Sequence, residues 1–271
     1  MLAYPHINPI LFSIGPLHIR WYGLMYVIGF AASYWLVLLQ AKRFGWKQLL
    51  TQMDNLNLAL ILGVILGGRL GYVVLYNPGH YLAHPLEIPA TWSGGMSFHG
   101  GCIGALLAGY WFCRRADLDF WKATDLYIAT VPIGLFFGRL GNFINGELFG
   151  RVTTVPWGMI FPDGGPLPRH PSQLYEAALE GILLFTVLWS LKTKPWQSPQ
   201  TGWPHGSLLA LFLCGYGCCR FIVEFFREPD AQLGFIAFHF SMGQILSGLM
   251  IVVGMGLWIG RKQSASQRGV A

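Results

Sequence analysis

Long apolar stretches, separated by short polar connections, dominate this chain of 271 residues. Several of them reach about 20 residues, the length that a helix needs to cross a hydrocarbon core roughly 30 Å thick. The pattern predicts seven membrane-spanning helices, near residues 21–41, 56–76, 98–113, 126–137, 174–191, 207–226 and 241–260. The fourth stretch is short, and a run of that length is also typical of a re-entrant or buried segment. We therefore expect an all-α polytopic membrane protein with a single membrane domain over residues 1–271.

Composition agrees with a membrane protein. The chain is 54% hydrophobic and 11% charged, whereas soluble domains are about one quarter charged. No basic residue precedes Arg20, and Pro5, Pro9 and Pro16 break the N-terminal segment, so we expect no cleaved signal peptide. The five cysteines show neither a Cys-x-x-Cys pair nor histidines at zinc spacing. They predict packing roles, and neither a metal site nor a disulfide framework.

The basic residues predict the orientation in the membrane. Lysines and arginines cluster after the first, third, fifth and seventh stretches, and cytoplasmic loops are enriched in both. The N-terminus is then expected outside and the C-terminus inside. The net charge of +6 has the same origin, because the lysines are spread over four loops instead of forming one patch. This distribution argues against nucleic-acid binding.

In this orientation all six lysines are cytoplasmic. The outer loops and the outer halves of the spans carry arginine as their only basic residue besides histidine. The outer arginines are Arg20, Arg69, Arg139, Arg151, Arg169, Arg220 and Arg227. The planar guanidinium binds phosphate or carboxylate through two parallel hydrogen bonds. We therefore expect an anionic group near the outer face. Snorkelling and pairing with nearby acids are the alternative, chiefly for Arg20 and Arg169.

The sixth stretch carries four polar residues on one helix face. Tyr216, Arg220, Glu224 and Arg227 follow one another at i, i+4, i+8 and i+11. Ionisable residues in a bilayer normally face the protein interior or a wet cavity, which makes them functional candidates. An ion pair that only locks helices together is the alternative. Glu176 and Glu180, also four residues apart, are candidate partners for the arginines.

Two glycine-rich pieces complete the candidate chemistry. Gly94–Gly101 places His99 between two glycine pairs, where backbone can approach a ligand. A histidine accepts protons near neutral pH, although a lone one commonly only satisfies a hydrogen bond. The tetrapeptide GRLG occurs at Gly68–Gly71 and again at Gly138–Gly141. We expect unwound backbone at both copies, cradling an anion at the outer ends of two spans.

Other histidines have less support for a role; they are His18, His80, His84, His205 and His239.

At this point the polar motifs match a known family. The segment GRLGNFINGELFGR, residues 138–151, resembles the signature of the bacterial prolipoprotein diacylglyceryl transferases. Further blocks resemble the same family in the same order. These are WYGLMY (21–26), GGMSFHGG (94–101), RHPSQLYE (169–176), GYGCCRFIVEFFREPD (215–230) and SMGQILS (241–247). The blocks span nearly the whole chain, so the resemblance is specific.

The resemblance implies an inner-membrane enzyme of seven spans whose active site opens to the periplasm. Members transfer the diacylglyceryl moiety of phosphatidylglycerol to the thiol of the lipobox cysteine in a preprolipoprotein. A thioether forms and glycerol phosphate leaves, in the first step of lipoprotein maturation. The resemblance implies no metal or organic cofactor.

The family's essential residues carry over motif by motif to Tyr22, His99, Arg139, Asn142, Glu147, Tyr216 and Arg220, with Gly150 in the signature. We expect Arg139 to hold the phosphate and to stabilise it as it leaves. Arg220 shares this task and favours the thiolate of the incoming cysteine. His99 is the expected proton acceptor, or it positions the headgroup.

The remaining candidates have supporting roles. Asn142 and Glu147 are expected to orient Arg139 and the glycerol hydroxyls. Tyr22 and Tyr216 offer phenol donors at the interface. The substrate-binding set also includes Arg69 and Glu224.

Two other classes of function stay open at this stage. A carrier for an anionic solute would use the same arginines at sites near the middle of the membrane, and it predicts paired, interrupted helices. The repeat of GRLG is the only hint of such a pair. A non-catalytic scaffold for envelope assembly leaves the clustered arginines without a reason.

Overall fold

The computed structural model describes residues 2–5, 7–15, 17–91, 94–197, 203–228, 235–237 and 240–268. Among these residues, five helical stretches are long and apolar enough to cross a membrane. They are Trp21–Arg43, Lys47–Leu75, Phe120–Asn145, Ser172–Trp196 and Met242–Gln267. Ser207–Val223 is a shorter apolar helix. The prediction of a mostly helical polytopic membrane protein is confirmed.

Internal contacts divide the chain into two compact units, Met1–Val37 with Thr124–Ala271, and Leu38–Ala123. The elements of the first unit are β1 Ile10–Ile14, β2 Leu17–Arg20, α1 Trp21–Arg43 as far as Val37, α5 Phe120–Ile128 from Thr124, α6 Val131–Asn145, α7 Ser172–Glu176, η3 Ala177–Leu183, α8 Leu184–Leu191, η4 Lys194–Trp196, α9 Ser207–Val223, β3 Phe235–Ala237, β4 Phe240–Ser241 and α10 Met242–Arg268. The strands form two antiparallel hairpins, β1 with β2 and β3 with β4.

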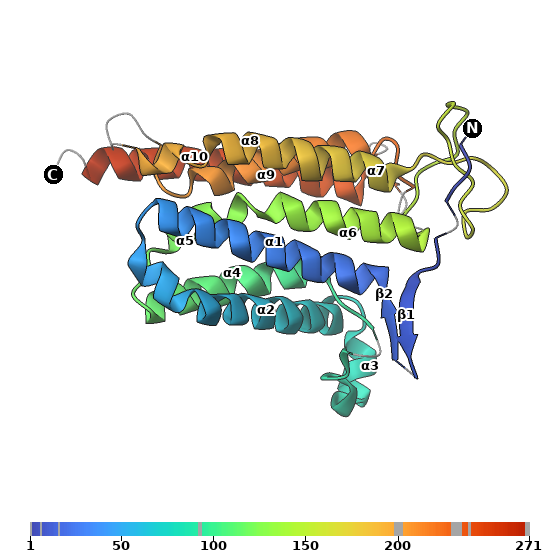
Figure 1. Ribbon diagram of the computed structural model, residues 1–271, viewed down its shortest axis with the longest axis horizontal. Helices are drawn as coiled ribbons and strands as arrows, with labels where there is room; N and C mark the ends of the chain where they lie inside the picture. The colour runs from blue at the N-terminus through green and yellow to red at the C-terminus, as the bar shows by residue number, and fades with distance from the viewer. Residues whose placement is uncertain are drawn as a thin grey trace. The chain divides into compact units, whose positions relative to one another are not determined.

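Helices α6 to α10 enclose the core of the first unit (Figure 1). Its buried apolar cluster consists of Ala129, Leu184, Leu188, Leu208, Phe212 and Tyr216. Helix α10 packs along α9, and α9 packs against α8. On another side of α6, Gly29 of α1 lies so close to the backbone that a Cβ there would be 3.2 Å from Gly134 Cα. Small residues at helix contacts in membranes allow this approach.

The helical stretch Ser172–Trp196 is not uniform. Its middle part, η3, is π-helical and lies between the α-helical parts α7 and α8. A π-helical turn inserts a residue and rotates the following side chains, and such turns are frequent at functional sites. Segment η3 packs against α6, where Gly181 meets Phe136. The π-helical turn therefore faces the helix that carries Arg139.

The second unit is built on a close helix pair. Its elements are α2 Lys47–Leu75, α3 Pro78–Ala83, η1 Pro85–Glu87 and α4 Phe98–Arg115. Glycines at positions 63, 67 and 71 of α2 meet Gly100 and Gly104 of α4, and a Cβ at Gly71 would lie 2.8 Å from Gly100 Cα. Glycines four residues apart are typical of closely packed membrane helices.

The structure moves several boundaries of the predicted spans. Helix α2 begins at Lys47 instead of residue 56, α9 ends at Val223 instead of residue 226, and α10 ends at Arg268 instead of residue 260. The fourth span was predicted at residues 126–137, whereas the apolar helical stretch runs over Phe120–Asn145. Hydropathy stopped short because Arg139 and Asn142 are polar, yet both belong to α6. The third span is matched by α4, but α4 is not among the five long apolar helices because it includes Arg114 and Arg115.

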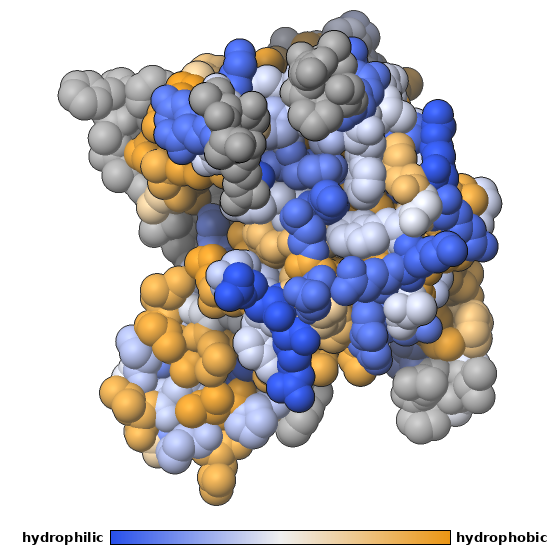
Figure 2. Space-filling model, turned by 90° about the vertical axis from the view of Figure 1, so that its left-hand side faces the viewer, coloured by the Kyte–Doolittle hydropathy of each residue, from blue (hydrophilic) through white to orange (hydrophobic). Residues whose placement is uncertain are grey.

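Several lysines lie at or near helix ends. In the second unit Lys42 ends α1 and Lys47 begins α2, and in the first unit Lys192 follows α8. Figure 2 shows hydrophilic residues (blue) beside hydrophobic residues (orange) on one face of the molecule. Exposed apolar side chains such as Leu66, Leu107 and Val252 cover the flanks of the helices instead. This distribution suits helices that cross lipid.

Candidate functional site

A buried cluster of three arginines and three glutamates occupies the first unit. We call Arg139, Arg220, Arg227, Glu176, Glu180 and Glu224 the arginine–glutamate cluster. Glu176 and Glu180 are at most 1% exposed, and the side chains of Arg139 and Arg220 are 17% and 14% exposed. The formal charges cancel, which lowers the cost of burying them. The predicted pairing of the arginines with Glu176 and Glu180 is confirmed.

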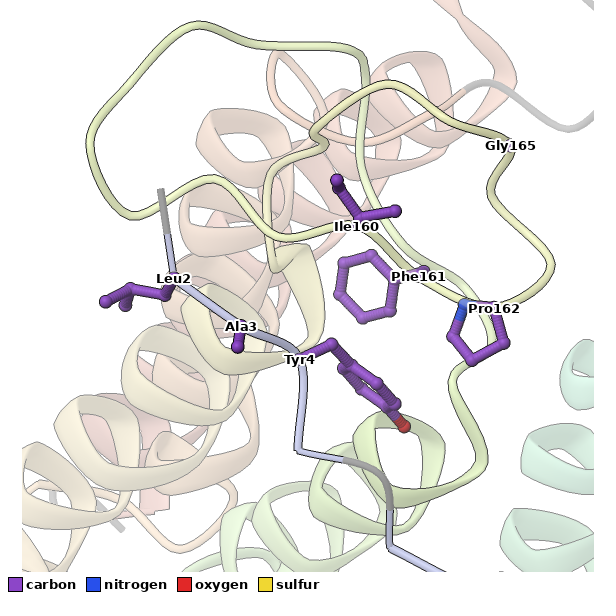
Figure 3. A pocket seen from close by; sticks show the side chains of 7 residues that line it. All are labelled: Leu2, Ala3, Tyr4, Ile160, Phe161, Pro162 and Gly165. Atoms are coloured by element: carbon purple, nitrogen blue, oxygen red, sulfur yellow. The ribbon is translucent and has the colours of Figure 1, made fainter.

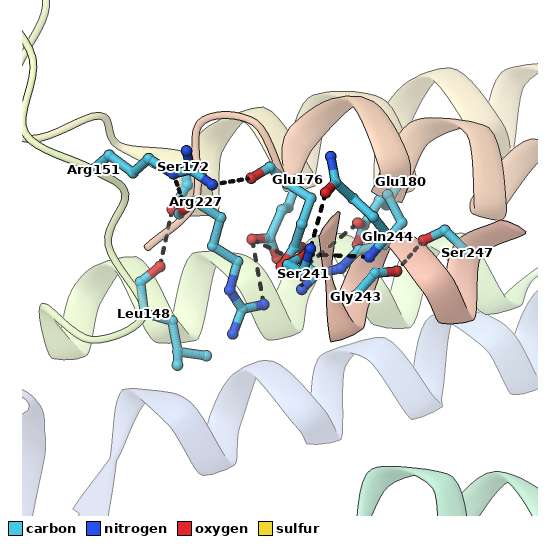
Figure 4. Close-up of polar contacts among 12 residues, drawn as sticks. Leu148, Arg151, Ser172, Glu176, Glu180, Arg227, Ser241, Gly243, Gln244 and Ser247 are labelled. Atoms are coloured by element: carbon cyan, nitrogen blue, oxygen red, sulfur yellow. Dashed lines mark hydrogen bonds and ion pairs between the residues drawn. The ribbon is translucent and has the colours of Figure 1, made fainter. Parts of the chain in front are cut away.

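Glu176 lies at the centre of the cluster. Its Oε2 is 2.5 Å from Arg139 Nε, and its Oε1 is 3.4 Å from Arg220 Nη1 and 3.9 Å from Arg227 Nη1. Glu180 lies 3.5 Å from Arg139 Nη2 and 3.9 Å from Arg220 Nη1. Figure 4 shows Arg227 extending beside Glu176. One helical stretch thus supplies both carboxylates that hold arginines from two other elements.

Helix α9 contributes only part of the predicted polar face, because it ends at Val223, so that Glu224 caps it and Arg227 lies beyond it. Arg220 Nη2 is 2.8 Å from Glu224 Oε2, four residues further along. Tyr216 is buried one turn earlier and stacks on Phe212 at 5.6 Å between ring centroids. A Cβ at Gly243, at the start of α10, would lie 2.6 Å from Glu224 Cδ. Only a glycine there leaves room for the Glu224 carboxylate.

Some donors of the cluster have no hydrogen-bond acceptor. Arg220 Nη1 is buried and forms no hydrogen bond among the described residues, since both neighbouring carboxylates lie beyond good hydrogen-bond length. Arg139 pairs through Nε and Nη2, and no ion pair engages its Nη1 in the part of the chain that the structure describes. Guanidinium donors of this kind bind the oxygens of phosphates or carboxylates. The cluster can therefore accept an anionic group.

The expectation of unwound backbone at the two GRLG copies is wrong. Gly138–Gly141 lies within α6, and Gly68–Gly71 lies within α2. The second glycine of each copy serves a helix contact: a Cβ at Gly141 would lie 3.0 Å from Tyr22 Cδ2, and one at Gly71 would lie 2.8 Å from Gly100 Cα. The backbone leaves the helical conformation only at Gly146, the left-handed residue that ends α6 with φ 69°.

A second polar group forms just beyond that end. Glu147 Oε1 accepts hydrogen bonds from Asn142 Nδ2 at 2.8 Å and from Asn145 Nδ2 at 3.3 Å. Gln173 Nε2 donates to the main-chain oxygen of Glu147 at 2.6 Å. Sequence reasoning identified Asn142 and Glu147 but missed Gln173, whose only signal was its place three residues before Glu176 in the RHPSQLYE block.

Gly150 lies where three chain segments meet. Its N–H donates to His170 O at 2.8 Å, and Arg151 N donates to Phe226 O at 2.9 Å. A Cβ on Gly150 would lie 2.8 Å from His170 Cβ and would clash with Phe226 O. Gly150 is therefore required for the approach of the segment that follows α9 and carries Arg227.

Several predicted anion-binding arginines instead hold loops. Arg151 Nε donates to Arg227 O at 2.8 Å. Arg169 bonds Gly164 O and Gly150 O, and it pairs with Glu228 at 2.9 Å. These contacts agree with the structural alternative for Arg169.

Arg69 also contacts main-chain oxygens. It donates to the carbonyl oxygens of Glu87, Ile88, Gly94 and Gly95 at 2.6–3.2 Å, and it lies over the Tyr81 ring at 5.1 Å. Four donor contacts to carbonyl groups leave little capacity for an anion. The substrate-binding role of Arg69 stays a prediction, and its contacts favour a role in fixing the segment between α2 and α4.

The remaining predicted residues divide between the two units. His99 is exposed in the first turn of α4, where Ser97 Oγ caps the helix by accepting from Gly100 N at 3.2 Å. His99 and Arg69 belong to the second unit, and the other predicted site residues belong to the first. Tyr22 Oη lies 3.0 Å from Tyr26 Oη. His239 lies outside the described residues.

An apolar pocket of about 360 Å³ lies in the first unit, beside the N-terminal segment (Figure 3). Leu2, Tyr4, Ile160, Phe161 and Pro162 line it. Tyr4 Oη donates to Phe143 O at 2.7 Å and so joins the pocket to the end of α6. The pocket contains none of the predicted site residues. No group of three or more His, Cys, Asp or Glu side chains suited to a metal ion occurs within the described residues.

Comparison with known proteins gives consistent matches. The family model described as prolipoprotein diacylglyceryl transferase matches residues 9–260. The phosphatidylglycerol–prolipoprotein diacylglyceryl transferase of Desulfotalea psychrophila is 62% identical over 257 residues, which cover 95% of this chain and 94% of that protein. The proteins of the same name from Geobacter sulfurreducens and Pseudoalteromonas atlantica are 51% and 50% identical, over 94% and 99% of this chain and 95% of each relative.

Proposed function

Because this chain belongs to the prolipoprotein diacylglyceryl transferase family, we propose that its arginine–glutamate cluster binds the phosphate of phosphatidylglycerol during diacylglyceryl transfer to a prolipoprotein. The enzyme is a phosphatidylglycerol–prolipoprotein diacylglyceryl transferase. The observation that carries the proposed site is Arg220 Nη1, a buried guanidinium donor without a hydrogen bond among the described residues, together with Arg139, whose ion pairs there use only Nε and Nη2.

The chemistry needs such donors. The acceptor is the cysteine thiol of the prolipoprotein, which attacks the glyceryl carbon as a thiolate. A carbon–sulfur bond forms, the carbon–oxygen bond to the phosphate breaks, and glycerol phosphate leaves with the bonding electrons. Arg139 and Arg220 stabilise the charge that builds up on the departing phosphate. Arg220 also favours the thiolate, and His99 stays the residue predicted from the family resemblance to accept the thiol proton.

The neighbours of the cluster prepare these arginines. Glu176 and Glu180 hold the two guanidinium groups in one orientation, which avoids the cost of ordering them during the reaction. Tyr216 and Tyr22 supply phenol groups to the site, and Asn142 and Glu147 orient the headgroup. Glu224 fixes Arg220 through its ion pair of 2.8 Å. No metal or organic cofactor takes part in this proposal.

We propose the number and direction of the membrane crossings on the same grounds. The five long apolar helices, together with α4 and α9, make seven crossings with the N-terminus outside and the C-terminus in the cytoplasm. Helices of 18 and 17 residues span roughly 25–27 Å at 1.5 Å per residue, close to the thickness of a hydrocarbon core. The arginine–glutamate cluster then opens to the periplasmic side of the inner membrane, where lipobox cysteines are presented.

One assay tests the proposed function. Purified protein is mixed with phosphatidylglycerol and a lipobox peptide, and mass spectrometry follows the peptide. The expected product carries one diacylglyceryl group on its cysteine, and the matched peptide with serine in place of cysteine stays unmodified. Anion uptake into liposomes without consumption of lipid would instead indicate a carrier, a class that the family match does not support.

A further inference from the structure

The side-chain amides around Glu147 leave two oxygens unused. Gln173 donates through Nε2 to Glu147 O, and Asn145 donates through Nδ2 to Glu147 Oε1. The other polar atom of each amide, Gln173 Oε1 and Asn145 Oδ1, is buried and has no hydrogen-bond partner among the described residues. Gln173 as a whole is only 1% exposed.

The orientation of both amides is fixed by chemistry. The oxygen and nitrogen of an amide have nearly the same shape, so the bonding partner must decide which is which. A main-chain carbonyl only accepts hydrogen bonds, and so does an ionised carboxylate. Gln173 and Asn145 must therefore turn their NH₂ groups toward Glu147. The atom without a partner is therefore the amide oxygen in both residues, and an amide oxygen is a hydrogen-bond acceptor.

A buried acceptor without a donor is unfavourable, and native structures normally pair such atoms. Two such acceptors, Gln173 Oε1 and Asn145 Oδ1, lie on side chains that bond Glu147. Their presence together indicates that a ligand brings the missing donors. Both oxygens are buried, and a ligand hydroxyl would supply the donor that each of them lacks. The ligand class is one that offers hydroxyl donors.

The position of these acceptors identifies the ligand further. Gln173 precedes Glu176 by three residues on one helical stretch, and Asn145 shares the Glu147 carboxylate with Asn142, which follows Arg139 by three residues in α6. Residues three apart share a helix face. Gln173 thus lies about one helical turn, roughly 5 Å, from Glu176 of the arginine–glutamate cluster, and Asn145 is linked to Asn142, one turn from Arg139, through the Glu147 carboxylate. A ligand that spans both places carries an anionic group at one end and hydroxyl donors next to it.

We propose that Gln173 and Asn145 are specificity-determining residues that accept hydrogen bonds from the two headgroup hydroxyls of the glycerol phosphate moiety. This inference rests on the proposed function, in which the arginines hold the phosphate of the same lipid. The buried amide oxygens select a diol headgroup because a lipid without a hydroxyl leaves one acceptor unpaired.

The test compares three lipids with wild type and two variants. The lipids are phosphatidylglycerol and two analogues that each lack one headgroup hydroxyl, phosphatidyl-1,3-propanediol and phosphatidyl-1,2-propanediol. We expect wild type to lose about tenfold or more in kcat/KM with each analogue, as removal of one buried hydrogen bond requires. In Gln173→Leu the loss for one analogue disappears, and in Asn145→Leu the loss for the other disappears. Gln40→Leu, which replaces a buried glutamine in α1, keeps the wild-type ratios.

The outcomes separate the inference from the proposed function. Equal kcat/KM of wild type on all three lipids overturns the inference while leaving transferase activity intact, and this measurement needs no variant to fold. An equal loss on all three lipids in Gln173→Leu also overturns it, because the residue would then only support Glu147. Absence of any transfer from phosphatidylglycerol in wild type overturns the proposed function itself, and the inference with it.

Discussion

Glu176 Oε2 lies 2.5 Å from Arg139 Nε, across the contact between α7 and α6. The same carboxylate, through its other oxygen, approaches Arg220 and Arg227. One glutamate therefore balances three arginines that come from different parts of the chain. A cluster of this kind is a structural unit whose members cannot be removed singly at low cost.

Glu176→Gln tests this role of the carboxylate. The amide keeps the size of the side chain but leaves one positive charge in the cluster without compensation. We expect the free energy of unfolding in detergent to fall by about 3–5 kcal/mol, the usual cost of breaking a buried pair. Glu228→Gln is the control, because Glu228 pairs with Arg169 while its side chain is 49% exposed, and it should cost less than about 1 kcal/mol. Equal effects of the two changes would contradict the central place of Glu176.

Arg139→Lys tests the need for a guanidinium group. Lysine keeps the charge but cannot bond two carboxylates and a phosphate in one plane. We expect kcat to fall by about 10²-fold or more while the unfolding midpoint changes little, and Arg139→Ala to lose at least as much activity. Arg114→Lys, at the exposed end of α4, should keep wild-type kcat. Near-normal turnover of Arg139→Ala with saturating lipid would exclude its role at the leaving group.

The sequence predicted the pairing at this site because helical spacing is a local property. Four residues separate Glu176 from Glu180, and four separate Arg220 from Glu224, so each pair shares a face in any helix. The π-helical turn at η3 was not predictable, since it depends on how Gly181 packs against Phe136 of another helix. The helical spacing therefore predicted which residues pair, but it did not predict how their side chains are oriented.

The roles of individual arginines were less predictable. Arg69 and Arg139 lie in the same tetrapeptide GRLG, yet one bonds main-chain carbonyls and the other bonds carboxylates. The difference comes from the segments packed around each arginine, which no four-residue pattern encodes. For the same reason Gly71 and Gly141, which predicted unwound backbone, turned out to serve close helix contacts.

Arg69→Lys distinguishes the two roles of that arginine. Lysine has three donors on one nitrogen and cannot reach carbonyl groups as far apart as Glu87 and Gly94. If Arg69 fixes this segment, hydrogen exchange at residues 85–95 speeds up by about tenfold or more, and KM for phosphatidylglycerol stays near wild type. Arg20→Lys should leave exchange in this segment unchanged. Unchanged exchange with a raised KM would instead return Arg69 to the anion-binding set.

Gly150→Ala tests the junction that positions Arg227. The added Cβ would clash with Phe226 O and would lie 2.8 Å from His170 Cβ, so the segment after α9 must move. We expect a loss of about 1–3 kcal/mol in the free energy of unfolding, together with lower kcat. Gly138→Ala is the matched control, because a Cβ at Gly138 of α6 meets nothing within 4 Å and alanine favours the helix. A stable and active Gly150→Ala variant would show that the junction tolerates the shift.

His170 predicts how the same junction responds to pH. Burial lowers the pKa of His170 below its ordinary value of 6.5, because the charged imidazole is poorly solvated beside Phe226 and Tyr175. The unfolded chain therefore binds the proton more readily than the folded chain. The contribution of neutral His170 to the free energy of unfolding is fully present above pH 6.5. It is lost as the pH falls below that value toward the lower pKa of the folded chain.

His170→Phe keeps the ring contacts and removes the titrating group. We expect the drop in unfolding temperature between pH 7.5 and pH 5.5 to be smaller in this variant than in wild type, because protonation no longer favours the unfolded chain there. His84→Phe, which replaces an exposed histidine in the second unit, should keep the wild-type drop. The same drop in wild type and His170→Phe would mean that other groups set the acid sensitivity of the protein.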